Sequence, residues 1–526
     1  MKNEIARRRT FAIISHPDAG KTTLTEKLLL YGGAIELAGS VTAKKKQRDT
    51  SSDWMELEKK RGISISSTLL QFEYNNFKMN LLDTPGHKDF SEDTYRVLTA
   101  VDGVIMVIDA GKGIESQTQK LFEICRKREI PIFTFMNKLD RPALPPLELI
   151  DQLEKVLGIH AFPVNWPLEN GPLFKGIFDR LTSQVYLFER VPGGAYRAPV
   201  TTHGIKDPSV KNILSVSSYS DIIEEVEMLD YAHAGLDRDE ILAGRTTPVF
   251  FGSAANNFGV ELLLNGFLEY SSGPLPRKST RGEVPLDSSI FSGFIFKVQT
   301  NMNPGHRDRM VFARVCSGVF QRDSKVFHMP HAKEIRISSS HSVFGREREV
   351  MDEAYPGDIL GFVTNTIFRV GDTITSDPAI VYNEIPRFAP ECFAYLHNVT
   401  TSAYKSFRKG IDHLLAEDIV QTFQLDGRPS AVPLLGAVGT LQFEVLQYRL
   451  RDEYGAESRL EMMPWSALRW LETEMDNEEL SRTLPYNAVL GIDSKDRRVV
   501  LFQNSWSVSG FTEKNPSILV LDSPRR

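Results

Sequence analysis

The sequence predicts three domains: an α/β domain with a phosphate-binding P-loop and an insertion, an antiparallel β-barrel, and an α+β domain at the C-terminal end. Three observations predict this fold class. A β-like run, Thr10–Ile14, is followed by a turn with the residues Gly-Lys-Thr and then by a helix-like run. Short β-like runs alternate with turns between residues 290 and 381. The remainder mixes helix-like and strand-like spacing. The first domain is expected at 1–275, with its insertion at about 161–244. The barrel is expected at 285–385 and the third domain at 386–526.

The overall composition is that of a globular protein with room for about three hydrophobic cores. The chain has 526 residues, of which 41% are hydrophobic and 25% are charged. Its three cysteines, Cys125, Cys316 and Cys392, form no CxxC pair, which favours a reducing compartment over a disulfide framework or a zinc site. The sequence shows no signal-like or membrane-spanning apolar stretch, so we expect a cytoplasmic protein.

The charge balance argues against a dedicated nucleic-acid binder, because the net charge is −6. Basic clusters nevertheless stand at Arg7–Arg9, Lys44–Lys46 and Lys59–Arg61, around the P-loop. A solvated surface is the more ordinary explanation of each cluster. A contact with a large anionic partner is the alternative.

The first candidate site is the turn between Thr10–Ile14 and the helix-like run from Thr22 to Leu30. Backbone N–H groups of such a turn wrap a β-phosphate, and the positive end of the new helix points at the same anion. Lys21 would reach the β- and γ-phosphates, and the Thr22 hydroxyl would bind Mg²⁺. Ser15 stands where the usual pattern has its first glycine, so the alternative is an ordinary helix start that contains glycine. The expected phosphate-binding residues are Ser15, His16, Pro17, Asp18, Ala19, Gly20, Lys21 and Thr22.

A second candidate set follows the run Phe77–Leu82. Asp83 falls where a Walker-B aspartate should stand, and it would hold Mg²⁺ through a water. Thr84 and Pro85 continue the turn. Gly86 lets its backbone N–H approach a γ-phosphate, because no side chain intervenes. Alone, Asp-Thr-Pro-Gly would be a simple turn. After a P-loop it indicates the phosphate side of a nucleotide site.

Two further βα units lead to a base-recognition motif. Their elements are the strand-like Val104–Ile108, the helix-like Ser116–Lys127 and the strand-like Pro131–Met136. The last strand ends in Asn137, Lys138, Leu139 and Asp140. A carboxylate at Asp140 can accept hydrogen bonds from guanine N1–H and N2–H₂ together, whereas adenine presents an acceptor at N1. Asn137 would hold the loop and the N7 edge of the base, and Lys138 would lie along the ring face.

The last part of such a site should be a short loop beside guanine O6. The strand-like Val249–Phe251 ends in Gly252, Ser253 and Ala254, and the backbone N–H of Ala254 would be the O6 donor. Asp140 and Ser253 are separated by far more residues than one helix and one strand need. This separation predicts the insertion at about 161–244, with a strand at Gln184–Phe188 and a helix at Ile222–Leu229.

The rest of the chain supplies the second and third domains. Residues 271–288 are rich in Ser, Pro and Gly and predict a linker. The expected barrel strands are Phe291–Lys297, Met310–Val315, Ser324–Phe327 and Glu334–Ile337. Pro386–Pro390 marks the next boundary. Val438, Leu441, Val445 and Tyr448 recur at helical spacing, which is typical of the core face of a helix.

In this order the motifs resemble those of the translational GTPases. They are SHPDAGKT (15–22), RGISI (61–65), DTPGH (83–87), NKLD (137–140) and GSA (252–254). Further stretches, at 9–17, 296–309 and 438–450, are similar to the class II release factors of that group. The resemblance implies that His87 orients the attacking water once ribosomal RNA has positioned it. It also places Ser64 where most of the family has a threonine that binds Mg²⁺ in the GTP state. Serine supplies the same hydroxyl with less rotamer restriction.

The resemblance implies a ribosome-stimulated GTPase that binds GTP or GDP with Mg²⁺. It would promote departure of the codon-reading release factors after the peptide is freed. Its partners would be the ribosome, both RNA and protein, and those release factors. We expect no membrane contact, and a monomer off the ribosome. The γ-phosphate and Mg²⁺ would order the loops around Ser64 and Gly86, and hydrolysis would release them.

Other functions stay open at this point. A guanine-nucleotide scaffold that never hydrolyses GTP is disfavoured because Lys21, Thr22, Asp83 and His87 occur together. A translocating elongation factor G is disfavoured because too few residues follow the expected barrel for that factor's three further domains. A P-loop ATPase is excluded to the extent that Asp140 reads guanine.

Overall fold

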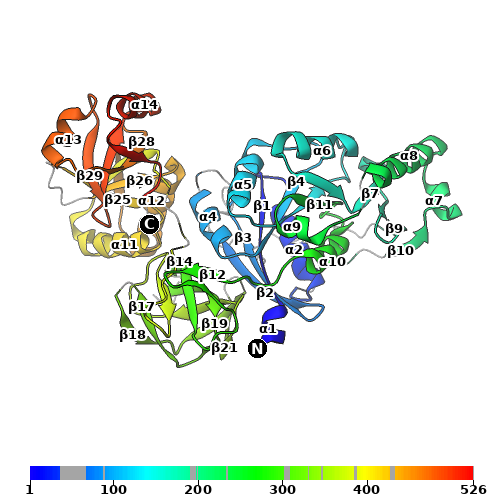
Figure 1. The fold of residues 1–526 in the computed structure, drawn as a ribbon, viewed down its shortest axis with the longest axis horizontal. Coiled ribbons are helices and arrows are strands. Elements are labelled where there is room, and N and C mark those ends of the chain that lie inside the picture. The colour runs from blue at the N-terminus through cyan, green and yellow to red at the C-terminus, as the bar shows by residue number, and fades with distance from the viewer. Residues whose placement is uncertain are drawn as a thin grey trace.

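The computed structural model describes most of the chain. The described residues are 1–35, 67–86, 89, 91–189, 197, 200–232, 235–300, 309–329, 331–344, 347–383, 385, 388–426 and 433–524. Ser64 and His87, with the whole RGISI motif, lie outside these ranges. The described residues form three domains: α1 to α10, then β14 to β23, then β24 to β31 (Figure 1).

The first domain is a mostly parallel sheet with helices on both faces. Its strand order is β2-β3-β1-β4-β5-β11-β6, in which β2 alone runs antiparallel to its neighbour. The strands are β1 (Arg8–Ser15), β2 (Thr68–Tyr74), β3 (Phe77–Asp83), β4 (Gly103–Asp109), β5 (Ile132–Asn137), β6 (His160–Pro163) and β11 (Thr246–Phe251). The helices are α1 (Lys2–Ala6), α2 (Lys21–Tyr31), α4 (Ser91–Thr99), α5 (Ser116–Lys127), α6 (Pro146–Gln152), α9 (Arg238–Leu242) and α10 (Val260–Tyr270), and a π-helical turn η2 (Leu153–Leu157) continues α6.

The central strands are apolar on both sides because helices cover both faces of the sheet. Along β1, Ala12 and Ile14 enter one hydrophobic cluster, and Phe11 and Ile13 enter the other. This alternation follows from the two-residue period of a strand. All of β4 is buried, as the continuous apolar run predicted.

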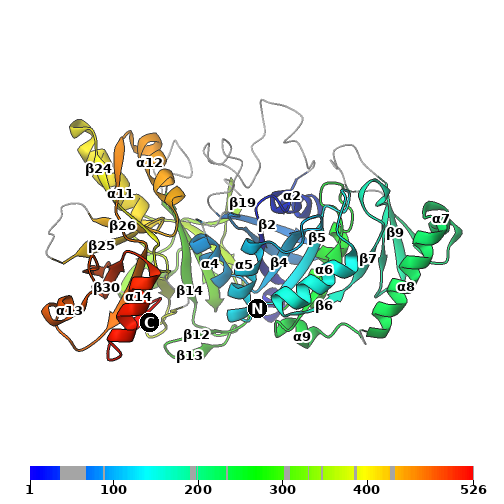
Figure 2. The same ribbon diagram turned by 90° about the horizontal axis from the view of Figure 1, so that it is seen from above.

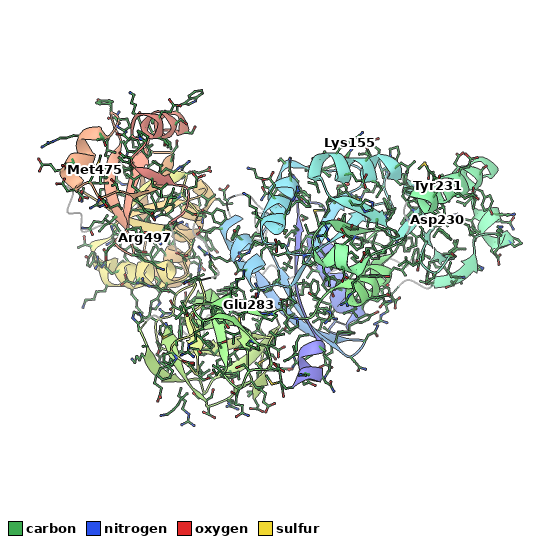
Figure 3. The ribbon with its side chains drawn as sticks, viewed as in Figure 1. Lys155, Asp230, Tyr231, Glu283, Met475 and Arg497 are labelled. Carbon is green, nitrogen blue, oxygen red and sulfur yellow. The ribbon has the colours of Figure 1, made fainter. Side chains whose placement is uncertain are left out.

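A small antiparallel sheet stands at the outer end of the first domain. It has the order β10-β9-β8-β7, and α8 packs beside it (Figure 2). The elements are β7 (Asn165–Leu168), η3 (Gly171–Leu173), β8 (Gly176–Asp179), β9 (Gln184–Phe188), β10 (Val200–Gly204), α7 (Pro208–Ile213) and α8 (Val216–Ala232). The guanidinium of Arg180 pairs with Asp230 of α8 at 2.8 Å. Figure 3 shows Asp230 and Tyr231 at this end of the molecule. Residues 160–163 belong to the main sheet as β6, so the small sheet starts a few residues after the expected beginning of the insertion.

The predicted linker is packed rather than extended. Within 271–288 the chain forms a hairpin of β12 (Arg277–Ser279) and β13 (Gly282–Val284). A guanidinium N–H of Arg277 donates to the Val101 carbonyl at 3.0 Å, and Val284 is buried. The Ser, Pro and Gly content of this segment predicts turns, but it does not predict which surface the segment packs against.

The second domain is an antiparallel β structure around one apolar cluster. Its strands follow the order β18-β17-β23-β14-β15-β22-β19, and β20 pairs with β19. They are β14 (Ser292–Thr300), β15 (Arg309–Ser317), β16 (Phe320–Gln321), β17 (Lys325–Met329), β18 (Lys333–Arg336), β19 (Ser340–Phe344), β20 (Glu347–Val350), β21 (Glu353–Ala354), β22 (Ile359–Val363) and β23 (Thr373–Thr375). The four strands expected from the sequence fall on β14, β15, β17 and β18.

The third domain is α+β. Its antiparallel sheet has the order β27-β24-β26-β25-β29-β30-β28-β31. The strands are β24 (Cys392–Asn398), β25 (Gln421–Leu425), β26 (Leu434–Ala437), β27 (Ser458–Met462), β28 (Ala467–Glu472), β29 (Val489–Asp493), β30 (Arg498–Phe502) and β31 (Leu519–Leu521). The helices are η5 (Thr401–Ala403), α11 (Tyr404–Ala416), α12 (Thr440–Tyr454), α13 (Asn477–Thr483) and α14 (Ser505–Lys514).

One element of the third domain differs from the sequence interpretation. Leu441 and Val445 lie on the buried face of α12, but Val438 precedes the helix. The Val438 N–H instead donates to the side-chain oxygen of Gln442 at 2.8 Å. A residue in the turn before a helix can stand three or four positions from a buried helical residue without being part of the helix.

The first and second domains share a buried, charged interface. The Arg8 guanidinium pairs with Asp358 at 3.1 Å, and Arg314 pairs with Asp102 at 2.5 Å. All four side chains are at most 6% exposed. A backbone bridge between Phe344 of β19 and Leu70 of β2 joins the two sheets. The two domains are therefore held together by both ion pairs and sheet continuity.

The third domain lies beside α4 of the first domain (Figure 1). Arg96 of α4 pairs with Asp418 at 2.7 Å, and the Leu441 N–H donates to the Asp89 carboxylate at 3.0 Å. A buried Arg449–Glu417 pair at 2.5 Å also joins the third domain to Thr300 of β14. Among the described residues, no helix combines the length and the apolar character needed to cross a membrane.

Candidate functional site

The phosphate loop connects β1 to α2 at the carboxyl edge of the parallel sheet. Asp18 and Gly20 have positive φ angles of 65° and 101°, which fold residues 16–20 into a tight turn. The Ala19 N–H donates to the His16 carbonyl at 3.2 Å, and the Leu24 N–H donates to the Gly20 carbonyl at 2.9 Å. Such a turn directs successive N–H groups into one concave site, which suits an anion.

The expected phosphate cation meets the expected metal carboxylate. Lys21 Nζ lies 2.5 Å from Asp83 Oδ1, and the two residues are only 7% and 2% exposed. Lys21 begins α2 and Asp83 ends β3, so adjacent parallel strands bring the two charges together. The pair places a positive and a negative group where phosphate and Mg²⁺ would each need one.

The rest of the Asp-Thr-Pro-Gly turn packs against the phosphate loop. The Thr84 hydroxyl donates to the Ile13 carbonyl of β1 at 2.7 Å. The Thr94 hydroxyl of α4 donates to the Pro85 carbonyl at 3.2 Å. An added Cβ at Gly86 would lie 3.7 Å from Pro17 Cα, an ordinary contact. The turn is thus anchored to the strand behind it and to α4 after it.

On the base side, Asn137 joins three loops. Its side-chain Nδ2 donates to the Ala19 carbonyl at 2.9 Å, and its Oδ1 accepts from the Ala254 N–H at 2.9 Å. The Ala254 N–H, which the sequence assigns to guanine O6, is therefore engaged inside the protein in this structure. The sequence could name this N–H but not its partner across the loop.

Asp140 is held by the neighbouring loop. The Ser253 hydroxyl donates to Asp140 Oδ1 at 2.6 Å, and the Leu139 N–H donates to the Gly252 carbonyl at 3.2 Å. Leu139 is fully buried, which anchors the motif to the core. The remaining oxygen of Asp140 is available as an acceptor for a donor edge such as guanine N1–H and N2–H₂.

Two residues outside the motifs, Asp109 and Glu115, contact the candidate site. Lys138 Nζ donates to the Asp18 carbonyl at 2.5 Å and lies 2.8 Å from Asp109 Oδ2. His16 Nε2 lies 3.3 Å from Glu115 Oε1. The sequence interpretation missed Asp109 and Glu115. A signal existed for Asp109, because it directly follows the apolar run of β4 at the sheet edge where α/β proteins bind ligands.

The structure thus gathers the described phosphate-side and base-side residues at one edge of the sheet. Thr22, in the first turn of α2, lies next to Lys21 in this group. Thr22 and Asp83 offer hydroxyl and carboxylate oxygens, the donors that Mg²⁺ prefers, so these residues fit the metal chemically. The expected metal and catalytic residues Ser64 and His87 lie outside the described residues.

Three family models match the chain. The Elongation factor Tu GTP binding domain matches residues 6–272, Elongation factor G domain 2 matches 290–377, and the Class II release factor RF3, C-terminal domain matches 382–512.

Curated relatives match almost end to end. A protein of Gloeobacter violaceus named Peptide chain release factor 3 is 51% identical over 516 residues, which are 98% of this chain and 97% of the relative. A protein of Synechocystis with the same name is 50% identical over 506 residues, covering 96% and 92% of the two chains.

A solved structure shares the fold. The crystal structure of ttk003000868 from Thermus thermophilus superposes with a TM-score of 0.70 at 21% identity. The match covers 90% of this chain and 71% of the other. At this identity the likeness concerns the arrangement of the domains and not a particular activity.

Proposed function

Because the chain belongs to the peptide chain release factor 3 family of translational GTPases, we propose that it drives departure of the codon-reading release factors from the ribosome after peptide release. Family membership makes the chain a GTP-hydrolysing factor of translation termination. The proposal adds the step of termination on which the GTPase acts. It also adds Mg²⁺ as the cofactor and a monomeric state off the ribosome.

One observation carries the proposal: the part of the site that would sense the γ-phosphate is joined to the third domain. Gly86 leads to Asp89 and α4, and both contact the third domain through Leu441 and Asp418. A change at Gly86 can therefore reach the third domain through a helix and two polar contacts. The release-factor family model covers that domain, which supports a task in termination.

The described residues account for binding of the nucleotide. Backbone N–H groups of 16–20 would hold the β-phosphate, and the Lys21 ammonium would leave Asp83 to meet the β- and γ-oxygens. Asp140 would accept from the guanine donor edge. When bound, Mg²⁺ would neutralise charge on the phosphates, and Thr22 and Asp83 would hold it. The switch from one Lys21 partner to the other links phosphate binding to the position of β3.

Hydrolysis would be slow without the ribosome. None of the motifs at 15–22 and 83–87 contains an arginine that could serve as an internal finger. His87 would orient the attacking water, and its productive position would depend on ribosomal RNA. We expect strong stimulation of GTP turnover by ribosomes. Equal turnover with and without ribosomes would contradict this.

The decisive experiment follows a fluorescent codon-reading release factor as it leaves post-termination ribosomes. The protein is added with GTP, and wild type is compared with His87→Ala. We expect marked acceleration by wild type. The variant tells whether departure needs hydrolysis or only GTP binding. If departure is not accelerated while ribosome-stimulated GTP turnover is intact, the proposed step is wrong and another ribosomal task remains for the GTPase.

A further inference from the structure

We propose that Asp109 is a positioning residue that holds Lys138 between the base loop and the phosphate loop, and thereby controls how long a guanine nucleotide stays bound. Asp109 lies in none of the five nucleotide motifs. The inference rests on the nucleotide site described above and deepens it.

The central contact is a three-part bridge. The Lys138 ammonium lies 2.8 Å from Asp109 Oδ2 and donates to the Asp18 carbonyl of the phosphate loop at 2.5 Å. The side chains of Lys138 and Asp109 are only 19% and 10% exposed. One ammonium therefore joins the base motif, the phosphate loop and the end of β4.

Both loops that meet at this ammonium have unfavourable backbone conformations. Asp18 has φ of 65° and Lys138 has φ of 68°, in the left-handed region that residues with a Cβ seldom adopt. Such conformations are unfavourable for residues with a Cβ and persist only where surrounding contacts enforce them. The shared ammonium is one such contact, and it acts on both residues at once.

Asp109 is itself fixed by the fold. Its register partner across β4 and β5 is Asn137, the residue before Lys138. Its Oδ1 accepts from the Gly111 N–H at 3.0 Å, which leaves Oδ2 turned to Lys138. Because the carboxylate is on the end of a buried strand, it presents a stationary charge to a flexible lysine.

The consequence for the nucleotide follows from the geometry. Without the Asp109 charge, the Lys138 ammonium is no longer attracted to a position beside the phosphate loop. The base loop then loses its hydrogen bond to the Asp18 carbonyl. Asn137 would still join Ala19 to the base loop. We therefore expect a faster dissociation rate of the nucleotide rather than a failure to bind. The association rate should change little, because the nucleotide enters the same open site.

Glu115 supports the same conclusion through a second contact with the phosphate loop. It is the last residue before α5, and its carboxylate lies 3.3 Å from His16. Glu115 thus contacts the phosphate loop directly, whereas Asp109 acts on it through Lys138, which donates to the Asp18 carbonyl. Asp109 is the sharper test, because its partner is the lysine of a nucleotide motif.

The test measures dissociation of fluorescent GDP by stopped flow for Asp109→Asn, Lys138→Met and the double variant. Asparagine can keep the hydrogen bond from Gly111 but removes the charge. We expect Asp109→Asn to raise the dissociation rate about tenfold and to change the association rate less than about twofold. In the Lys138→Met background the same change should have little further effect, since the cation that it holds is gone. Asp109→Glu should restore part of the slow dissociation.

Asp179→Asn provides the matched control. Asp179 also ends a buried strand, β8, and accepts from a backbone N–H two residues later, that of Leu181 at 2.9 Å. It lies in the small outer sheet, away from the nucleotide motifs, so its variant reports the cost of changing a turn-capping carboxylate. We expect both asparagine variants to fold, and altered GDP release for Asp109→Asn alone.

The alternative results are distinct. GDP release within about twofold of wild type for Asp109→Asn, or full additivity with Lys138→Met, would overturn the positioning role. Failure of the wild-type protein to bind GDP would instead overturn the nucleotide site on which the inference rests.

Discussion

Two glycines of the candidate nucleotide site have very different surroundings. A Cβ added at Gly20 would lie 2.2 Å from Asn137 Nδ2, closer than real Cβ contacts allow. Among the residues that the structure describes, a Cβ added at Gly86 would have no neighbour closer than Pro17 Cα at 3.7 Å. The same substitution therefore tests two different requirements at the two positions.

We expect Gly20→Ala to abolish binding of both GDP and GTP. The clash would displace Asn137, which joins the phosphate loop to the base loops, and the φ of 101° adds strain for a residue with a Cβ. Titration with fluorescent GDP should show affinity reduced at least about a hundredfold. Gly33→Ala is the control, because Gly33 also has a positive φ, 70°, but no atom of the described residues within 4 Å of an added Cβ, and no place in the site. That variant should bind GDP as wild type does.

Gly86→Ala should discriminate between the two nucleotides. The described residues around Gly86 leave room for the methyl group, so the fold and GDP affinity should be preserved. The Gly86 N–H is expected to approach the γ-phosphate, and a Cβ would crowd that approach. GTP affinity should fall about tenfold or more in a parallel titration. An equal loss for GDP would show that Gly86 serves the turn and not the γ-phosphate.

At the scale of residues, motif order selected Lys21, Asp83, Asn137 and Asp140, which the structure gathers at one sheet edge, and their roles in binding stay a prediction. The sequence predicted fewer of their partners within the protein. Asp109 was missed because its contact with Lys138 depends on the register between β4 and β5. The engagement of Ala254 by Asn137 was missed for the same reason, since spacing along the chain does not report contacts between loops.

Helices α11 and α12 pack together through a histidine whose titration affects stability. The His413 ring nitrogen lies 3.1 Å from the Tyr454 hydroxyl. Burial lowers the pKa of His413 below its usual value, and the nearby charges of Arg309 and Lys409 lower it further. The folded third domain therefore favours the neutral ring.

This depressed pKa gives a signed prediction. The unfolded chain takes up a proton at His413 as the pH falls through about 6.5, whereas the folded chain resists until a lower pH. The contribution of this residue to stability is fully present above about pH 6.5 and is lost as the pH falls towards the folded pKa. Denaturant titrations of wild type and His413→Gln between about pH 7.5 and about pH 5 should converge as the pH falls. Parallel pH dependence for the two proteins would contradict the assignment.

At the scale of elements, the hydrophobic pattern of the sequence predicted which helices and strands exist better than it predicted where they end or how they pack. Continuous apolar runs gave the buried parallel strands, and β9 was expected with the ends that the structure shows. The expected linker 271–288 contains the β12–β13 hairpin, which the sequence did not predict, because its position depends on Arg277 reaching Val101 in another element. Local composition does not predict contacts between residues that are far apart in the sequence.

The third domain is attached to the first through a buried cation. Arg96 is 5% exposed and lies 2.8 Å from Glu92 and 2.7 Å from Asp418. Burial lowers the pKa of Arg96, but the charges of Glu92 and Asp418 outweigh it and hold the pKa above its usual value. The guanidinium is therefore a permanent charge between two carboxylates, one from each domain.

We expect Arg96→Met to weaken the attachment of the third domain without changing GDP affinity. Removing the cation between Glu92 and Asp418 should cost about 3 kcal/mol of docking free energy. Distances between spin labels on the first and third domains should broaden, and calorimetry should show the third domain unfolding earlier. Arg482→Met is the matched control, because the Arg482–Glu478 pair is 72% and 82% exposed. Indistinguishable distance distributions for both variants and wild type would contradict this role of Arg96.

The joined interface of the first two domains also determines where the chain can be cut. A fragment ending near residue 275 would keep every nucleotide motif but lose Asp358, the partner of a fully buried Arg8, and the strand that extends the sheet beyond β2. A fragment ending at residue 383 would keep both. The shorter piece should therefore aggregate on expression, and the longer piece should bind GDP. The first and second domains should therefore fold as one unit, to which the third domain is added.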